Sequence, residues 1–398
     1  MSLNETPSAN RIHIGFFGRR NAGKSSLVNA VTGQNIAVVS DIAGTTTDPV
    51  NKSMELLPLG PVVITDTAGF DDEGVLGVLR IEKTKEVLKK TDIAVLVVDI
   101  SEGLTDCDRE LLELFKEKNI NYIIAYNKCE LTDTIADLKE NEIAVSALKK
   151  INITELKNML ANMKPKESSA YMVSDFVNPG DTVVFVTPID ESAPKGRLIL
   201  PQQMAIRDCL DCGAVSVVTQ PEQLSGVLTS LKDKPKLVVT DSQVFNKVKD
   251  IVPEDIMLTS FSILMARVKG LLESAVDGAI VLDTLKNGDT VLVSEACTHH
   301  RQCNDIGTVK LPHWLENYTK KKLNFEFTSG GAFPDELGKY ALIVHCGGCM
   351  INEKQMTERI KCAKEQNIPI TNYGTVIAHI NGILKRSLEI IPHLYNKL

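Results

Sequence analysis

The sequence predicts an α/β protein with parallel sheets, divided into three parts. Short apolar segments typical of strands alternate with helical segments along most of the 398 residues. This alternation favours parallel sheets, because a crossover between parallel strands needs the length of a helix. A polar, proline-containing stretch at 164–169 marks one boundary and a second lies near Ser260. We expect domains at residues 1–165, 170–260 and 261–398.

A glycine-rich segment directly follows the first predicted strand. Residues 18–25 read Gly-Arg-Arg-Asn-Ala-Gly-Lys-Ser, between the apolar run 13–17 and a helical run at 26–31. The backbone N–H groups of such a P-loop cradle phosphates, its lysine reaches the outer phosphates and its serine binds Mg²⁺. The segment predicts a nucleoside triphosphate site formed by Asn21, Ala22, Gly23, Lys24, Ser25 and Ser26.

Two further motifs are typical of switch segments. Thr45 and Thr46 lie in Gly-Thr-Thr-Thr-Asp after the first helix, where a threonine can close over the γ-phosphate and Mg²⁺. Asp66 and Gly69 belong to Asp-Thr-Ala-Gly after the strand 62–64, where they can hold Mg²⁺ through water and contact the γ-phosphate. We therefore expect Lys24, Thr46, Asp66 and Gly69 to act in hydrolysis, with Ser25 and Thr46 on magnesium.

The next two motifs favour guanine over adenine. Asn127, Lys128 and Glu130 follow the strand 122–126, and a carboxylate here can accept two hydrogen bonds from the guanine edge. Ser146 and Ala147 follow the strand 143–145 and can offer a backbone N–H to the guanine oxygen. Adenine cannot supply the matching groups, so the motifs together predict binding of GTP and GDP.

These motifs resemble the translation-factor-like GTPases, and within them the Era/TrmE group, which carries Asn-Ala-Gly-Lys-Ser-Ser and Gly-Thr-Thr as this chain does. Two positions depart from the common pattern. Glu130 replaces the usual aspartate, which predicts weaker or less selective guanine binding, and Phe70 stands where Ras-like enzymes place a water-orienting glutamine. The resemblance implies slow hydrolysis assisted by K⁺, held partly by Asn21.

Composition is that of an ordinary globular protein. The chain is 43% hydrophobic with a net charge of −7, so it can bury a large core and has no general affinity for nucleic acid or anionic membranes. No apolar run reaches the roughly 18 residues of a membrane span, and the first ten residues lack the apolar core of a signal peptide. With nine cysteines favouring free thiols or metal ligands, we expect a cytoplasmic protein without nucleic-acid or membrane partners.

A second group of candidate ligands lies in the last part. Cys297 and His299 follow the strand 290–293, and His345, Cys346 and Cys349 follow the strand 340–344. Ligands bind past the carboxyl ends of strands in open α/β sheets, and thiolates select zinc or iron–sulfur clusters. The residues alone leave a zinc site, an iron–sulfur cluster and buried structural cysteines open. The Cys-x-x-Cys pair Cys209 and Cys212 lies on an apolar helix, and we expect both in the core.

A GTPase module followed by Cys-x-His, 45 residues and His-Cys-x-x-Cys resembles the HydF family of FeFe-hydrogenase maturation GTPases. The resemblance implies a middle dimerisation domain and a 4Fe-4S cluster on Cys297, Cys346 and Cys349, with the fourth ligand among His299, His345, a carboxylate, Cys303 or solvent. It implies a scaffold that holds a transient diiron subcluster and transfers it to apo-hydrogenase. The implied partners are radical-SAM maturases, the apo-FeFe-hydrogenase and further copies in a homodimer or higher homo-oligomer.

Two other functions compete with this interpretation. One is a tRNA-modification or ribosome-assembly GTPase with a zinc-binding C-terminal domain; the absence of a basic, aromatic-rich patch argues against it. The other is a redox enzyme with a regulatory GTPase domain. The overall prediction is a P-loop GTPase domain followed by two smaller α/β domains with parallel sheets.

Overall fold

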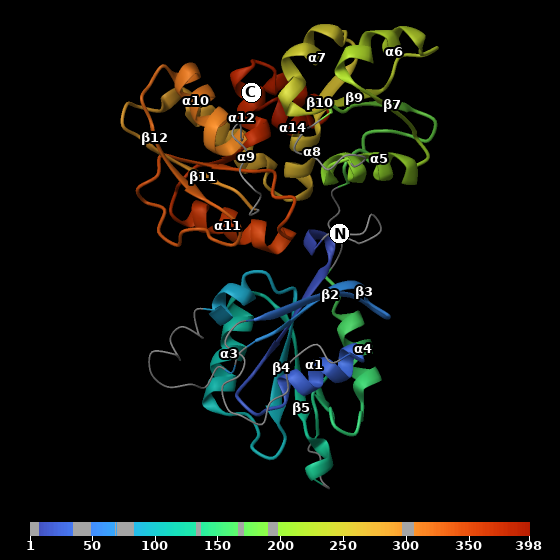
Figure 1. Ribbon diagram of the computed structural model, residues 1–398, viewed down its shortest axis with the longest axis vertical. Helices are drawn as coiled ribbons and strands as arrows, with labels where there is room; N and C mark the ends of the chain where they lie inside the picture. The colour runs from blue at the N-terminus through green and yellow to red at the C-terminus, as the bar shows by residue number, and fades with distance from the viewer. Residues whose placement is uncertain are drawn as a thin grey trace. The chain divides into compact units, whose positions relative to one another are not determined.

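The computed structural model describes residues 8–34, 49–67, 69, 83–132, 137–165, 171–189, 198–296 and 306–398. The chain forms two compact units, Met1–Glu167 and Ser168–Leu398, each with its own sheets and core (Figure 1). The finer division at residues 165, 170 and 260 remains a prediction.

The first unit is built on a six-stranded sheet in the order β2-β3-β1-β4-β5-β6. Only the β2–β3 pair is antiparallel. The strands are β1 (Ile12–Phe17), β2 (Val50–Leu56), β3 (Gly60–Asp66), β4 (Ile93–Asp99), β5 (Asn121–Asn127) and β6 (Glu142–Ala144). Helices α1 (Lys24–Thr32) and α4 (Ile153–Asn162) cover one face and α3 (Asp106–Glu117) the other (Figure 1).

Burial explains why these segments form a central parallel sheet. β4 is apolar along almost its whole length, and its alternate residues enter two separate cores, one under α1 and α4 and one under α3. A strand covered on both faces needs such continuous apolar sequence. Five of the strands, β1, β3, β4, β5 and β6, run parallel to one another. The loops that follow them therefore meet at one edge of the sheet.

The second unit contains two four-stranded, all-parallel sheets with the same strand order. Their orders are β10-β9-β7-β8 and β12-β11-β13-β14, so each places its first strand between its second and third. The strands are β7 (Thr182–Val186), β8 (Val215–Thr219), β9 (Leu237–Thr240), β10 (Met257–Ser260), β11 (Thr290–Ser294), β12 (Asn324–Thr328), β13 (Leu342–His345) and β14 (Ile370–Asn372). The parallel sheets confirm the predicted fold class.

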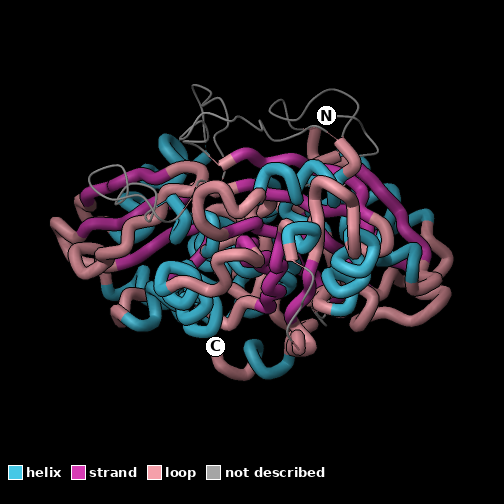
Figure 2. Tube along the Cα trace, turned by 90° about the horizontal axis from the view of Figure 1, so that it is seen from below, coloured by secondary structure: helices cyan, strands magenta, loops and turns pink. Residues whose placement is uncertain are grey.

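Helices separate most of these strands along the chain, whereas a loop without a helix joins β12 to β13. Figure 2 shows the helices in cyan and the strands in magenta. The helices are α5 (Leu200–Asp211), α6 (Leu224–Ser230), α7 (Phe245–Ile251), α8 (Phe261–Val268), α9 (Leu272–Ile280), α10 (Leu311–Thr319), α11 (Glu353–Glu365), α12 (Tyr373–Ile380), α13 (Leu384–Ser387) and α14 (Pro392–Tyr395). One core draws residues from α5, α8, α9, α11 and α12, so the two sheets share it and form one unit. No helix among the described residues is long and apolar enough to cross a membrane.

The same turn leads into the first strand of each of these sheets. Gly180 and Gly288 have φ angles of 88° and 87°, a left-handed conformation that glycine adopts without strain. Asp181 accepts a hydrogen bond from the N–H three residues before it, at 2.8 Å, and Asp289 does the same. The sequence Gly-Asp-Thr-Val-Val at 180–184 recurs as Gly-Asp-Thr-Val-Leu at 288–292, which predicts one turn into a strand used twice, and the two matching turns confirm this.

The structure confirms one further expectation, on two cysteines, and contradicts another, on a helix near the C-terminus. Cys209 is fully buried in the shared core and Cys212 packs against it, as expected for core residues. The sequence pattern predicts one helix over about 373–388, and this prediction is wrong, because α12 ends at Ile380 and α13 begins at Leu384. Gly382, at a φ of 69°, breaks the helix between them.

Candidate functional site

The P-loop runs from the end of β1 to the start of α1, and two of its glycines are required by space and by conformation. Gly18 has a φ of 136°, and a Cβ there would lie 2.3 Å from the Val97 carbonyl oxygen. Gly23 has a φ of 87°, and its Cβ would lie 2.2 Å from Nδ2 of Asn127. Any side chain at either position would displace the loop from its neighbours, so the loop's close packing depends on glycine.

Lys24 is buried inside this loop. Its Nζ donates to the carbonyl oxygens of Gly18, at 2.9 Å, and Arg19, at 2.6 Å. The ammonium is therefore fixed within the ring of backbone that would surround a phosphate chain. A phosphate oxygen competes well for this donor, because it carries a negative charge that the two carbonyl oxygens lack.

Ser25 and Asp66 come together beside Lys24. The Ser25 hydroxyl donates to Oδ2 of Asp66 at 2.6 Å, and Asp66 is 2% exposed. Burial raises the pKa of Asp66, while the bond from Ser25 and the charge of Lys24 oppose the rise. Oδ1 of Asp66 is buried without a hydrogen-bond partner in the described part of the chain. Two hard oxygen donors, one of them unsatisfied, fit Mg²⁺.

Asn127 joins the P-loop to the loop after β6. Its Nδ2 donates to the Ala22 carbonyl oxygen at 3.0 Å, and its Oδ1 accepts from the Ala147 N–H at 3.1 Å. The residue is almost fully buried. One side chain therefore holds together two of the segments that the sequence predicts around the nucleotide.

Glu130 and Ser146, which are both predicted to contact the guanine base, lie next to each other. A hydrogen bond from the Ser146 hydroxyl holds the pKa of Glu130 below its usual value, despite partial burial. Oε2 of Glu130 is buried and has no partner among the described residues. A carboxylate kept charged, with one oxygen unsatisfied, can accept hydrogen bonds from a base edge.

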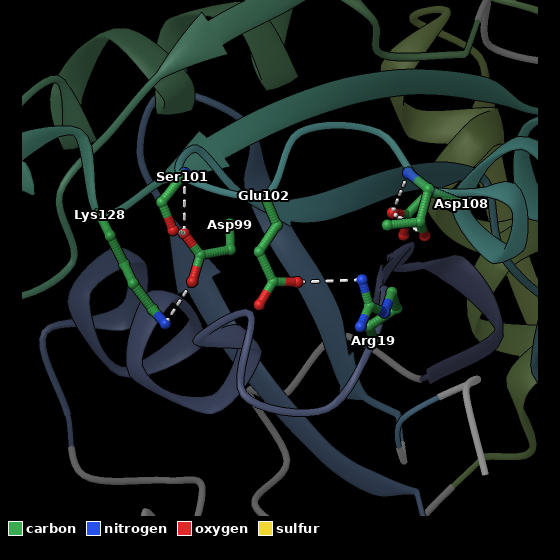
Figure 3. Close-up of polar contacts among 7 residues, drawn as sticks. Arg19, Asp99, Ser101, Glu102, Asp108 and Lys128 are labelled. Carbon is green, nitrogen blue, oxygen red and sulfur yellow. Dashed lines mark hydrogen bonds and ion pairs between the residues drawn. The ribbon is translucent and has the colours of Figure 1, made fainter. Parts of the chain in front are cut away.

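Lys128 extends from the same loop toward the end of β4. Its Nζ donates to Oδ2 of Asp99 at 2.6 Å, and Ser101 donates to Oδ1 of Asp99 (Figure 3). Burial alone would raise the pKa of Asp99, but these hydrogen bonds outweigh it and lower the pKa. The same figure shows Glu102 reaching Arg19 of the P-loop, at 3.0 Å.

A small cavity of about 70 Å³ lies beside the P-loop, and most of the residues labelled in Figure 3 line it. It is lined by Arg19, Arg20, Asn21, Ala22, Val97, Val98, Asp99, Glu102, Gly103, Asp108 and Lys128. The pair of Arg19 and Glu102 was not among the predicted site residues. The sequence shows Arg19 in the P-loop and Glu102 after the strand 93–99, but it does not show that they meet. The pairing of β1 with β4 brings their two loops together.

The structure gathers the described nucleotide-site residues at the carboxyl edge of the first sheet. Asn21 to Ser26, Asp66, Asn127, Lys128, Glu130, Ser146 and Ala147 come from the loops after β1, β3, β5 and β6. Gly69 is buried just past β3. Thr45, Thr46 and Phe70 lie outside the described residues, as do Cys297, His299 and Cys303.

The segment 346–349, which we call the cysteine loop, begins at the end of β13, next to β11. Cys346 donates its N–H to the Ser294 carbonyl oxygen, and its Sγ accepts the N–H groups of Ala296 at 3.1 Å and Gly348 at 3.4 Å. Gly348 has a φ of 66°, and a Cβ there would lie 2.4 Å from Cε of Met356. The glycine therefore lets the loop turn so that two backbone N–H groups point at one sulfur.

His345 is fully buried, and both ring nitrogens are bonded. Nε2 lies 2.8 Å from Nη1 of Arg359, and Nδ1 lies 2.7 Å from the Cys346 carbonyl oxygen. Because a guanidinium can only donate, Nε2 accepts and Nδ1–H donates. Burial lowers the pKa of His345 to about 3, with help from the Arg359 charge and against the backbone hydrogen bond. The imidazole is neutral, with Nε2 engaged by Arg359.

The cysteine loop stands at the switch point of its sheet. In the order β12-β11-β13-β14, the chain leaves β11 toward one side and β13 toward the other, and ligands bind where strand order reverses. Among the described residues, no group of three His, Cys, Asp or Glu side chains could hold a metal ion. Two thiols, one of which accepts two backbone N–H groups, fit ligation of a soft metal or an iron–sulfur cluster.

Comparison with known proteins covers each part of the chain. Residues 13–128 match the model of 50S ribosome-binding GTPases, and residues 81–195 match the elongation factor Tu GTP binding domain. The tRNA modification GTPase MnmE of Streptococcus pneumoniae serotype 4 is 37% identical over 155 residues, 38% of this chain and 33% of that protein. MnmE of Clostridioides difficile is 37% identical over 159 residues, 38% of this chain and 34% of that protein. The chain thus spans about a third of the curated relatives it matches.

Among solved structures, Era in complex with MgGDPNP and a 16S ribosomal RNA fragment is 18% identical, with a TM-score of 0.35 over 52% of this chain and 93% of that one. The second unit matches two other models. Residues 172–270 match the hydrogen maturase F dimerization domain, and residues 273–390 match the hydrogen maturase F tetramerization domain. With a GTPase domain before them, these two domains, which cover more than half of the chain, show that it belongs to the hydrogen maturase F (HydF) family of hydrogenase maturation GTPases.

Proposed function

We propose that this protein is a GTP-hydrolysing scaffold that binds a 4Fe-4S cluster and carries the diiron precursor of the FeFe-hydrogenase active site. The GTPase domain and the two hydrogen maturase F domains support hydrogenase maturation as the process. The observation that carries the cluster is the Cys346 sulfur, which receives two backbone N–H groups at the switch point of a parallel sheet. Cys297 and Cys349 are the other proposed thiolate ligands.

The proposed nucleotide chemistry uses the residues around the P-loop. Lys24 and the P-loop N–H groups bind the phosphates, Ser25 and Asp66 hold Mg²⁺, and Asn127 with Glu130 reads the base. Mg²⁺ supplies positive charge that neutralises the phosphate oxygens as the bond breaks. Thr45, Thr46 and Gly69 complete the proposed contacts to the γ-phosphate.

Hydrolysis is proposed to be slow and stimulated by K⁺. Phe70 cannot orient water, and Asn21 stands in the P-loop with a φ of 60°. Replacing sodium by potassium at constant ionic strength should raise phosphate release severalfold, because the cation adds charge at the phosphates without a new side chain. Equal rates in the two salts would instead point to a group supplied by a partner protein.

The proposed cluster site needs a ligand for its fourth iron. In the described structure Nε2 of His345 is bonded to Arg359, so His345 would have to exchange that bond to reach iron. His299, Cys303, a carboxylate and solvent remain candidates. A weakly bound position suits a carrier, because cargo can displace it without breaking an iron–thiolate bond.

The proposed partners are the radical-SAM maturases that build the precursor and the apo-hydrogenase that receives it. The dimerization and tetramerization domains support homo-oligomers. We place the protein in the cytoplasm, where free thiols persist, and propose no nucleic-acid or membrane partner.

One experiment tests the proposal against its alternatives. Anaerobically purified protein should contain iron and sulfide with a visible absorption band, and Cys346→Ser should lose them. Zinc without iron would instead favour a tRNA-modification or ribosome-assembly GTPase; tRNA modification is the function in the name of the MnmE relatives of its first unit. Cys212→Ser is the matched control, because Cys212 lies on α5's cap, in the core.

A further inference from the structure

Two buried cations flank the cysteine loop from different helices. Arg359 of α11 is 4% exposed, and Lys269, the residue that follows α8, is also 4% exposed. Placing a charge in a protein interior costs several kcal/mol unless an opposite charge or several hydrogen bonds compensate it. Each cation therefore needs a reason for its position.

The hydrogen-bond partners of the Arg359 guanidinium are neutral in the part of the chain that the structure describes. It donates to the Gly330 carbonyl oxygen at 2.8 Å and to Nε2 of His345 at 2.8 Å, with a longer contact of 3.4 Å to the Ser294 hydroxyl. Its fourth neighbour is the Phe333 ring, 5.1 Å away. These contacts join the ends of β11 and β13 and the loop after β12, but they bring no negative charge.

Arg359 reaches the cysteine loop through His345, which binds the guanidinium at Nε2 and donates Nδ1–H to the Cys346 carbonyl oxygen at 2.7 Å. Arg359 interacts electrostatically with the Cys346 thiol, the same sulfur that accepts two backbone N–H groups. Thus the guanidinium and the two N–H donors converge on Cys346, where all of them would stabilise the negative charge of a metal-bound sulfur.

Lys269 plays the corresponding part for the second cysteine. Its Nζ donates to the Ile351 carbonyl oxygen at 2.9 Å, which fixes the backbone two residues after Cys349. Its ammonium also interacts with the Cys349 thiol: burial raises the pKa of this thiol, and a backbone hydrogen bond and the Lys269 charge only partly oppose the rise. Lys269 lies within the stretch that matches the dimerization domain, whereas Cys349 lies in the tetramerization domain.

We propose that Arg359 and Lys269 are positioning residues for the cluster, whose buried charges hold the two thiolates in place and set the cluster's reduction potential. The inference rests on the proposed cluster function. A cluster held by thiolates is anionic and gains a further negative charge when it is reduced. A fixed cation in a low-dielectric surrounding stabilises the reduced form more than the oxidised form.

The test uses the full chain, reconstituted anaerobically with ferrous iron and sulfide. Arg359→Gln and Lys269→Gln remove one charge each, and Arg359→Lys keeps the charge while losing the forked geometry. Lys361→Gln is the matched control, since it removes a charge from the same helix at an exposed side chain paired with Glu365. Iron and sulfide per chain, the midpoint potential from paramagnetic resonance, and the melting of the cluster-free protein are measured for each.

Both neutral variants should shift the midpoint to more negative potentials, and the shifts should roughly add in the double variant, because each cation acts on a different sulfur. Arg359→Lys should return the midpoint toward that of the wild type, and Lys361→Gln should leave it unchanged. Loss of iron from a folded Arg359→Gln protein, with iron kept in Arg359→Lys, would also support the inference.

Unchanged midpoints in folded, iron-loaded neutral variants would overturn the inference while leaving cluster binding intact. It would also be overturned if the neutral variants failed to melt cooperatively without the cluster, since the residues would then serve the fold alone. A wild-type protein without iron and sulfide would instead remove the proposed cluster function itself, and with it this inference.

Discussion

At the residue scale, the nucleotide site carries unsatisfied oxygens. Oδ1 of Asp66 and Oε2 of Glu130 are buried without partners among the described residues, and each belongs to a side chain predicted to bind a ligand. A buried acceptor without a donor costs about 1–3 kcal/mol. In this chain both costs fall where Mg²⁺ and the guanine edge would relieve them, which is typical of a binding site.

Asp66→Asn should stabilise the protein in the absence of magnesium and nucleotide. Burial raises the pKa of Asp66, so its contribution favours folding at acid pH and is lost as pH rises through the folded pKa. At pH 7 the amide should raise the free energy of unfolding by on the order of 1 kcal/mol, and the gain should vanish below about pH 4. Urea unfolding at both pH values measures this; Mg²⁺-GTP should then stabilise only the wild type.

Glu130→Asp should tighten GTP binding. The shorter side chain returns the carboxylate to the position that guanine-reading motifs use, and a well-formed charged hydrogen bond contributes about 1.5–3 kcal/mol. We expect a gain of about tenfold in affinity for GTP with no change for ATP, measured by calorimetry. Glu142→Asp, on the edge strand β6, serves as control. Weaker GTP binding in Glu130→Asp would mean that the loop is adapted to the longer side chain.

At the element scale, one sheet edge stands out among the described strands. β8 is an edge strand with the sequence Val-Ser-Val-Val-Thr, and Val215 and Val218 are about half exposed. The edge strand β12 of the other sheet instead carries Glu326, paired with Lys339 and bonded to Tyr340. Uncharged apolar edges pair with other chains unless a charge prevents it. β8 lies in the stretch that matches the dimerization domain.

Val218→Lys should therefore weaken self-association while leaving the fold intact. A lysine on an edge strand opposes pairing because its charge would have to be desolvated. Sedimentation over a range of concentrations should show a smaller species for this variant than for the wild type. Leu57→Lys, at an exposed apolar residue of the first unit, is the control and should sediment like the wild type. An unchanged oligomer in Val218→Lys would place the dimer contact on another surface.

At the scale of the whole molecule, the chain consists of two separate compact units with different chemistry. The nucleotide residues all lie in Met1–Glu167, and the cysteine loop lies in Ser168–Leu398. Within the second unit the two sheets share one core, so residues from the stretch matching one domain, such as Lys269, reach the cysteine loop of the other.

Lys24→Ala should abolish GTP hydrolysis and leave bound iron unchanged. Lys24 donates to two P-loop carbonyl oxygens, and its loss removes the charge that is proposed to bind the phosphates. Phosphate release and iron content measured on one sample test both halves of this expectation. A simultaneous loss of iron would show that the two units do not act independently.

The sequence by itself determined the elements and the chemistry of the first unit. Continuous apolar runs followed by Gly-Lys-Ser, Asp-Thr-Ala-Gly and Asn-Lys-Cys-Glu predict a parallel sheet with a nucleotide at its edge, because each motif is local and the motifs follow one another in the expected order. The turn used twice, before Thr182 and Thr290, was also readable, since Gly-Asp in a tight turn is a local choice. Thr45, Thr46 and Cys297 remain predictions outside the described residues.

Only the tertiary structure decided which distant residues meet. Asn127 reaching Ala22, Glu102 reaching Arg19, and Arg359 reaching His345 depend on strand order, and no local pattern encodes strand order. The break between α12 and α13 was missed because glycine is tolerated in helices, and packing against the core decides whether it ends one. Burial, too, is a property of the assembled fold. Burial distinguishes Arg359 and Lys269 from most of the chain's 44 basic residues.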